Sequence, residues 1–235
     1  MLINNETKNE TMLTSIVGME RCDMVLQLAK LIRNAKTASK ENSYSSVLLI
    51  DNSFSQELYN MVSIGDSGVA DYRGITIINN VGYSPKEFIK YDHILIYHGL
   101  RVEPVLLMES DHIYVITNYE KNLNKRIGRQ FEAIDGLQSK RFTVIYRDKA
   151  GKKVSEKNVN HYACIPEKNI VSQHILKYDI KDYMLYLALT HNGSQKIKNY
   201  SEPFISALEA MVRQILNWED KNSHRYFLKL VRKAK

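Results

Sequence analysis

Two adjacent stretches decide the fold: MLTSIVG at residues 12–18 and DMVLQLAKLI at residues 23–32. The first is a short apolar run that ends at a glycine, a pattern typical of a buried strand. In the second, the apolar positions 24, 25, 28, 31 and 32 follow the spacing of one helix face. Only residues 19–22 separate the two stretches, so the sequence predicts a strand that turns directly into a helix.

Five further apolar segments have the length and composition of buried strands: 47–51, 74–79, 93–97, 112–117 and 142–146. Helical spacing recurs at Leu123, Ile127, Phe131 and Ile134, and again from 202 to 218, where Pro203 suits a first helical turn. Continuous apolar strands that alternate with helices indicate a mostly parallel sheet. We therefore predict an α/β fold, a doubly wound and mostly parallel sheet with helices on both faces.

The predicted domain spans residues 12–218. A polar N-terminus at 1–11 is expected to be flexible, and a basic amphipathic helix is expected at 219–235. The polar segments 36–46 and 151–160 are predicted loops within the domain.

The composition excludes several classes of protein. Of the 235 residues, 44% are hydrophobic and 25% are charged, which suits a domain with a sizeable core. No apolar run approaches the ~20 residues of a membrane-spanning helix. Two cysteines, Cys22 and Cys164, are too few for a disulfide scaffold or a four-cysteine zinc site. We therefore expect a cytoplasmic protein without a bound metal.

The order of these elements resembles the MinD/ParA family of deviant-Walker P-loop ATPases over roughly residues 12–217. The first strand runs into a helix where a P-loop sits, the second ends in Asp51, and the segment Ile165-Pro166-Glu167 follows later. The resemblance implies a P-loop NTPase-like fold. It also implies, for the family, a dimer that holds ATP between its two subunits.

The phosphate-binding residues of that family are replaced in this sequence. A P-loop reads G-x-x-x-x-G-K-[ST], in which the lysine neutralises phosphate and the hydroxyl holds Mg²⁺. Counted from Gly18, the second glycine becomes Asp23, the lysine becomes Met24 and the hydroxyl becomes Val25. The additional lysine of the family becomes Met19. We expect the Asp23 carboxylate to face the position of phosphate, and no cation to be available there.

Other family positions differ as well. Asp51 is retained, but the second acid of its motif is Ser53, and the acid that ends the fourth strand is Tyr97. The asparagine that contacts adenine corresponds to Tyr146, which Arg147 follows. The sequence therefore predicts a degenerate nucleotide site, a pseudo-ATPase without cofactor. One alternative stays open, in which Arg21 or a lysine of a partner subunit replaces the lost charge.

The net charge of +7 is concentrated at the end of the chain, because residues 225–235 hold five basic residues and no acid. On a helix these residues oppose an apolar face, the composition of a helix that lies on an anionic membrane. The residues expected to bind the membrane are Arg225, Tyr226, Phe227, Lys229, Leu230, Val231, Arg232 and Lys233. The alternatives are a helix packed on the domain and a tail that docks on nucleic acid or protein.

Two further groups of residues were weighed. His98 ends a strand and is interpreted as a polar strand-end residue, since no serine or cysteine elbow accompanies it. Lys121, Lys125, Arg126 and Arg129 lie at helical spacing and are interpreted as a solvated helix face, with DNA binding as the alternative.

These observations lead to one functional hypothesis. The chain is expected to be a nucleotide-independent scaffold, not an enzyme, that recruits protein partners of an envelope assembly such as a pilus or secretion system. It would act in the cytoplasm, peripherally at the inner face of the membrane, with a homodimer as one expected assembly and no small-molecule substrate. Nucleic acid is not the expected partner. The alternatives are an ATPase with altered phosphate contacts and a partition-like DNA-binding protein.

Overall fold

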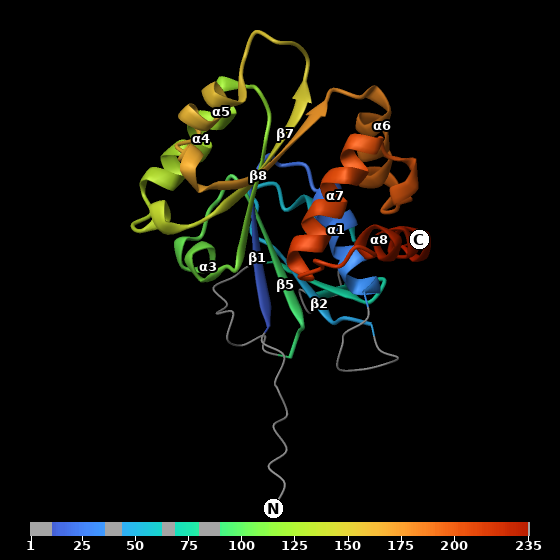
Figure 1. The fold of residues 1–235 in the computed structure, drawn as a ribbon. Coiled ribbons are helices and arrows are strands. Elements are labelled where there is room, and N and C mark those ends of the chain that lie inside the picture. The colour runs from blue at the N-terminus through green and yellow to red at the C-terminus, as the bar shows by residue number, and fades with distance from the viewer. Residues whose placement is uncertain (1–10, 36–43, 63–68, 80–89, 235) are drawn as a thin grey trace, which may run out of the picture.

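Eight strands form one sheet in a computed structural model of the chain, which describes residues 11–35, 44–62, 69–79 and 90–234 (Figure 1). The strand order is β3-β4-β2-β5-β1-β6-β7-β8, and all described neighbours are parallel except β3 and β4. The strands are β1 (Met12–Gly18), β2 (Val47–Asp51), β3 (Val69–Tyr72), β4 (Ile75–Asn79), β5 (His93–Gly99), β6 (His112–Thr117), β7 (Phe142–Lys149) and β8 (Ile170–Lys177). The prediction of a mostly parallel sheet is confirmed.

Helices cover both faces of the sheet (Figure 1). Among the described residues, three separate hydrophobic clusters fill the layers. The first lies beneath α1, α7 and α8, the second beneath α3, α4 and α5, and the third joins β1, β2, β4 and β5 to Leu106 of α3. The helices are α1 (Asp23–Asn34), α2 (Glu57–Met61), α3 (Pro104–Glu109), α4 (Lys121–Glu132), α5 (Glu156–Tyr162), α6 (Ile180–Asn192), α7 (Glu202–Ile215) and α8 (Ser223–Lys233). The predicted doubly wound arrangement is therefore confirmed.

Helix α1 lies at the centre of the first core. Every residue from Asp23 to Ile32 is buried, because α7 and α8 cover the side that does not face the sheet. Its first residue follows β1 after the four residues 19–22, so the start of α1 is held at the carboxyl edge of the strands.

Several elements were not predicted. β8 alternates half-buried and exposed residues along an edge of the sheet, so it lacks the continuous apolar run by which six strands were predicted. The short β3 was not predicted either. The loop predicted at 151–160 is wrong in its second half, because α5 begins at Glu156 with Ser155 as its N-cap. The predicted helix to residue 218 ends at Ile215, and Asn217 adopts a left-handed conformation at φ 50°. The flexible segment 1–11 lies outside the described residues except for Thr11, as does most of the loop 36–46.

Gly18 is required where β1 ends. Its φ is +122°, and a Cβ atom there would lie 2.1 Å from the carbonyl oxygen of Ile116 on β6. The next residue, Met19, donates its N–H to the same oxygen at 2.7 Å. The chain can leave the sheet at this point only because residue 18 has no side chain.

We predict that Gly18→Ala lowers the free energy of unfolding by more than about 2 kcal/mol, since the added methyl group overlaps backbone and the φ value is strained. Urea denaturation followed by circular dichroism measures the change. Gly151→Ala is the matched control, because no atom lies within 4 Å of the position that its added methyl group would take, and its effect should stay within about 0.5 kcal/mol. Equal midpoints for the two variants would contradict the close approach of Gly18 to β6.

Candidate functional site

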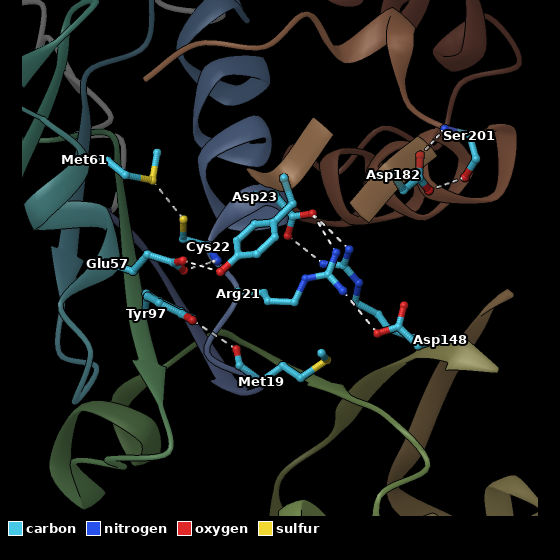
Figure 2. Close-up of polar contacts among 12 residues, drawn as sticks. Met19, Arg21, Cys22, Asp23, Glu57, Met61, Tyr97, Asp148, Asp182 and Ser201 are labelled. Atoms are coloured by element: carbon cyan, nitrogen blue, oxygen red, sulfur yellow. Dashed lines mark hydrogen bonds and ion pairs between the residues drawn. The ribbon is translucent and has the colours of Figure 1, made fainter. Parts of the chain in front are cut away.

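The turn at residues 19–22 lies at the carboxyl edge of the sheet, where α/β folds of this kind bind ligands. Side chains from α1, α2, α6 and β7 meet around it (Figure 2). The candidate site residues of the sequence are found at or next to this edge: the turn contains Met19, α1 begins with Asp23, and Asp51 pairs in register with Tyr97. Met24 and Val25 are fully buried in the core, so they do not face this edge.

Asp23 forms a buried ion pair with Arg147 of β7. Arg147 Nη1 lies 2.6 Å from Asp23 Oδ1, and Nη2 lies 2.9 Å from Oδ2. Both side chains are almost completely excluded from solvent, at 0% and 2% exposure for Asp23 and Arg147. Burial alone raises the pKa of Asp23, but the ion pair and hydrogen bonds of Arg147, with the nearby Arg21, outweigh burial and hold that pKa below its ordinary value.

This pair corrects one expectation from the sequence. No cation was expected at the turn, yet Arg147 and Arg21 both lie there. The Asp23 carboxylate does not point into open space to repel phosphate; it is paired within the protein. The arginine was missed because Arg147 lies 124 residues from Asp23 in the sequence. The available signal in the sequence was an arginine, Arg147, directly after the predicted strand at 142–146.

Arg21 is surrounded by acids and aromatic rings. Its Nη1 atom lies 3.1 Å from Asp148 Oδ2, and its Nη2 atom lies 3.7 Å from Asp23 Oδ2. Its guanidinium carbon lies 4.7 Å from the ring centre of Tyr186 and 5.5 Å from that of Tyr183, both on α6. With Arg147, two guanidinium groups and two carboxylates therefore form a cluster of zero formal charge at the start of α1.

Glu57 of α2 supplies an anion to the turn. Its Oε2 atom accepts the backbone N–H of Cys22 at 3.0 Å, and its Oε1 atom accepts a hydrogen bond from the Tyr186 hydroxyl (Figure 2). Burial and the neighbouring Glu57 raise the pKa of Tyr186, which keeps its hydroxyl protonated as a donor. In a P-loop the N–H groups of this turn bind phosphate; here a carboxylate of the protein occupies one of them.

Asp51 and Tyr97 are also engaged within the fold. Asp51 Oδ1 accepts hydrogen bonds from the N–H and hydroxyl of Ser53 at 3.0 and 2.6 Å, and its Oδ2 atom accepts the N–H of Tyr59 at 3.1 Å. The Tyr97 hydroxyl donates to the carbonyl oxygen of Met19 at 3.0 Å. The acid that the sequence retains thus holds the connection from β2 to α2. In the described part of the chain, no group of three or more His, Cys, Asp or Glu residues could hold a metal ion.

Solved structures of P-loop ATPases have the same arrangement of strands and helices. The MinD cell division protein of Aquifex aeolicus aligns with a TM-score of 0.52 and 15% identity over 88% of this chain and 98% of its own. A ParA family ATPase from Chlorobium tepidum aligns with a TM-score of 0.50 and 12% identity over 89% and 98% of the two chains. A Cyanothece McdA variant solved with ATP aligns with a TM-score of 0.51 and 11% identity over 90% of this chain and 98% of its own. This chain has the ParA/MinD fold.

At these identities the likeness concerns the fold alone. No protein-family model matches the sequence, and no curated protein sequence matches it either. The turn at residues 19–22 joins the first strand to the first helix, and its four residues equal the spacing between the two glycines of G-x-x-x-x-G. What differs is its chemistry, since internal carboxylates and arginines surround it.

The C-terminal helix packs on this fold. Phe227 and Leu230 of α8 are buried in the core beneath α1 and α7, and Val231 is half-buried against it. The expectation that these residues form a free apolar face is therefore wrong for Phe227 and Leu230. The remaining residues expected to bind the membrane stay on the surface: Arg225, Tyr226, Lys229, Arg232 and Lys233. No described helix is long and apolar enough to cross a membrane.

The basic residues of α4 are exposed, as their spacing predicts for a solvated helix face: Lys121, Lys125, Arg126 and Arg129. DNA binding by this face is untested.

His98 lies in a buried network next to the turn. Its Nδ1 atom accepts the N–H of Glu103 at 3.3 Å, so the proton of the neutral ring belongs on Nε2, which lies 2.9 Å from Ser15 Oγ. Ser15 Oγ in turn lies 2.7 Å from Ser110 Oγ. His98 therefore donates to Ser15 and cannot act as its base, which supports a structural role. Burial lowers the pKa of His98 to about 4.

We predict that Arg147→Met lowers the free energy of unfolding by about 3–5 kcal/mol, because it removes both hydrogen bonds of the buried Asp23 carboxylate to Arg147 and leaves it only the longer ion pair with Arg21 at 3.7 Å. The double variant Asp23→Leu/Arg147→Met should recover most of that loss, since neither charge remains. Arg126→Met, on the exposed face of α4, is the control and should change the value by no more than about 0.5 kcal/mol. Additive losses in the double-mutant cycle, measured by urea denaturation, would contradict the pairing.

We predict that His98 makes the protein less stable in acid. The unfolded chain binds this proton near pH 6.5, whereas the folded chain binds it only near pH 4. The contribution of the neutral His98 to stability is therefore fully present above about pH 6.5. As the pH falls from about 6.5 to about 4, this group lowers the free energy of unfolding by about 1.4 kcal/mol per pH unit. Urea midpoints from pH 4.5 to 7.5 should show a smaller slope for His98→Asn than for the wild type. His191→Asn, at an exposed position of α6, is the matched control. Identical slopes in both variants would contradict a neutral buried His98.

Proposed function

We propose that this chain is a ParA/MinD-like protein that works without bound nucleotide, as a constitutive scaffold for protein partners. The observation that carries the proposal is the occupied turn. The bond from the Cys22 N–H to Glu57 satisfies, from within the protein, a kind of group that phosphate engages in a P-loop. The buried pair of Asp23 with Arg147 fills the start of α1 beside it.

Electrostatics argues against a triphosphate in this place. Its charge would lie beside the carboxylates of Glu57 and Asp23, and each like-charge pair at 4 Å costs about 4 kcal/mol at an effective dielectric constant of about 20. Binding through the arginines instead would first break a buried ion pair, whose disruption costs several kcal/mol. Both lysines that offset such costs in the family are methionines here, Met19 and Met24.

The neighbouring structures suggest what such a scaffold binds. One of them is a complex of MinD with a second protein, MinC, from Aquifex aeolicus, at a TM-score of 0.50 and 13% identity over 94% of this chain and 95% of its own. By analogy, we propose a protein partner for this chain, from a membrane-associated machine such as a pilus or secretion assembly. Exposed apolar residues of α6 offer a contact surface at the same edge of the sheet: Ile180, Tyr183 and Met184.

The same proposal includes the inner face of the cytoplasmic membrane as the place of action. Since the apolar face of α8 is packed, attachment would depend on charge, through the exposed residues Arg225, Lys229 and Arg232. Each basic residue near an anionic leaflet contributes about 1 kcal/mol, which favours weak and reversible attachment.

A second candidate is an ATP-binding protein with altered phosphate contacts. The observation that favours it is the presence of two guanidinium groups, Arg21 and Arg147, beside the turn. Arginine binds phosphate well because its planar guanidinium group can donate two parallel hydrogen bonds to it. If the cluster opened, these groups could replace the missing lysines.

Titration calorimetry with ATP and Mg²⁺ separates the two candidates. For the scaffold we predict no binding heat up to about millimolar nucleotide, because the turn is occupied. Micromolar binding that Arg21→Gln weakens at least about tenfold, while the exposed control Lys221→Gln leaves it unchanged, would overturn the proposal in favour of the second candidate.

A further inference from the structure

A basic cavity lies at the opposite edge of the sheet from the turn at residues 19–22. It has a volume of about 180 Å³ and lies between the last turn of α1, the connection from β3 to β4 and the end of α8. Its lining residues are Lys30, Arg33, Asn34, Arg73, Ile75 and Lys233. Four cations from three separate parts of the chain therefore converge on one hollow, and its described lining contains no acidic residue.

Lys30 brings a buried positive charge to this cavity. Its side chain is 3% exposed, and its Nζ atom donates to the carbonyl oxygen of Gln195 at 3.0 Å. Among the described residues, no carboxylate forms a salt bridge with Lys30. Burial and the charge of Arg73 lower the pKa of Lys30 to about 8. A buried ammonium group without an acid nearby is costly, and an anion in the cavity would offset that cost.

Arg33 offers a donor that nothing in the described chain uses. Its Nε atom donates to the carbonyl oxygen of Gly74 at 2.9 Å, and its guanidinium carbon lies 4.8 Å from the ring centre of Tyr44. The Nη1 atom is shielded from solvent and has no hydrogen-bond partner among the described residues. Asp71, the acid of the adjacent turn, accepts the N–H of Gly74 instead. A fixed guanidinium group with a spare N–H suits an oxyanion.

We propose that this cavity binds a phosphate group, with Lys30, Arg33 and Lys233 as its cationic contacts. The volume is below the ~300–1,000 Å³ of sites for drug-sized ligands, so it suits a phosphate group with a small substituent and excludes a whole nucleotide. Lys233 connects the cavity to the exposed basic side of α8, so the phosphate could belong to a free small molecule or to a lipid headgroup. The inference does not depend on the proposed function, because the two places lie at opposite edges of the sheet.

Calorimetric titration of the full chain with inorganic phosphate, in a buffer with chloride as the only other anion, tests the free-ligand source. We expect saturable binding that Arg33→Gln and Lys233→Gln each weaken by about tenfold or more. Lys221→Gln is the matched control, since it removes one charge from an exposed position just before the same helix and outside the cavity, and its effect should stay within about twofold. Circular dichroism confirms that each variant is folded.

Flotation with vesicles tests the lipid source. Phosphatidylglycerol vesicles, compared with phosphatidylcholine vesicles, should retain the wild-type chain and the Lys221→Gln variant and lose the Arg33→Gln variant. Retention by vesicles without binding of free phosphate assigns the site to a headgroup, and the reverse assigns it to a small molecule. The proposal is overturned if neither probe binds, or if Lys221→Gln loses as much binding as Arg33→Gln, because general surface charge then explains the result.

Discussion

The buried contact between Asp23 and Arg147 is the constraint on which the carboxyl edge of this molecule depends. It joins the first residue of α1 to the end of β7, whereas β1, which leads into α1, is separated from β7 by β6 in the sheet order. Neither side chain is exposed to solvent, so each charge is stabilised by the other and not by water. Around this pair, Arg21 is held by Asp148 and by the rings of α6, and Glu57 reaches the N–H of Cys22. The turn is therefore enclosed by a polar network of the protein's own groups.

A strand, a short turn and a buried helix thus begin a chain of the ParA/MinD fold, and the protein's own charged groups surround the turn. In a P-loop the helix start and the lysines bind an external anion, the phosphate of the nucleotide. Here the anions come from Asp23 and Glu57, and the cations come from Arg21 and Arg147. The fold is shared with the ParA and MinD ATPases, and the site has to be judged on its own residues.

The sequence was sufficient for the fold class because six strands are continuous apolar runs and α1 and α7 carry strong helical spacing. It was insufficient for β8, whose alternating pattern reflects an edge position, and for α6, whose apolar residues lie on several sides. The altered positions of the turn were found from the resemblance to the MinD/ParA family and the spacing of its P-loop. Their partners were not, because Arg147, Glu57 and Tyr186 come from distant segments that only the folded chain brings together. Likewise, composition showed an amphipathic α8 but not that its apolar side covers α1.

The position of α6 has a consequence for how this edge of the molecule can change over evolutionary time. Asp182 of α6 accepts both the N–H and the hydroxyl of Ser201 at 2.7 and 2.6 Å, which anchors α6 to the start of α7 while Tyr186 reaches Glu57 (Figure 2). The network is thus distributed over α1, α2, α6 and β7. A lysine at position 24 in place of Met24 would put a charge in a filled apolar core. An open phosphate cradle at this turn would require concerted exchanges in four elements, so a single substitution is not enough to create one.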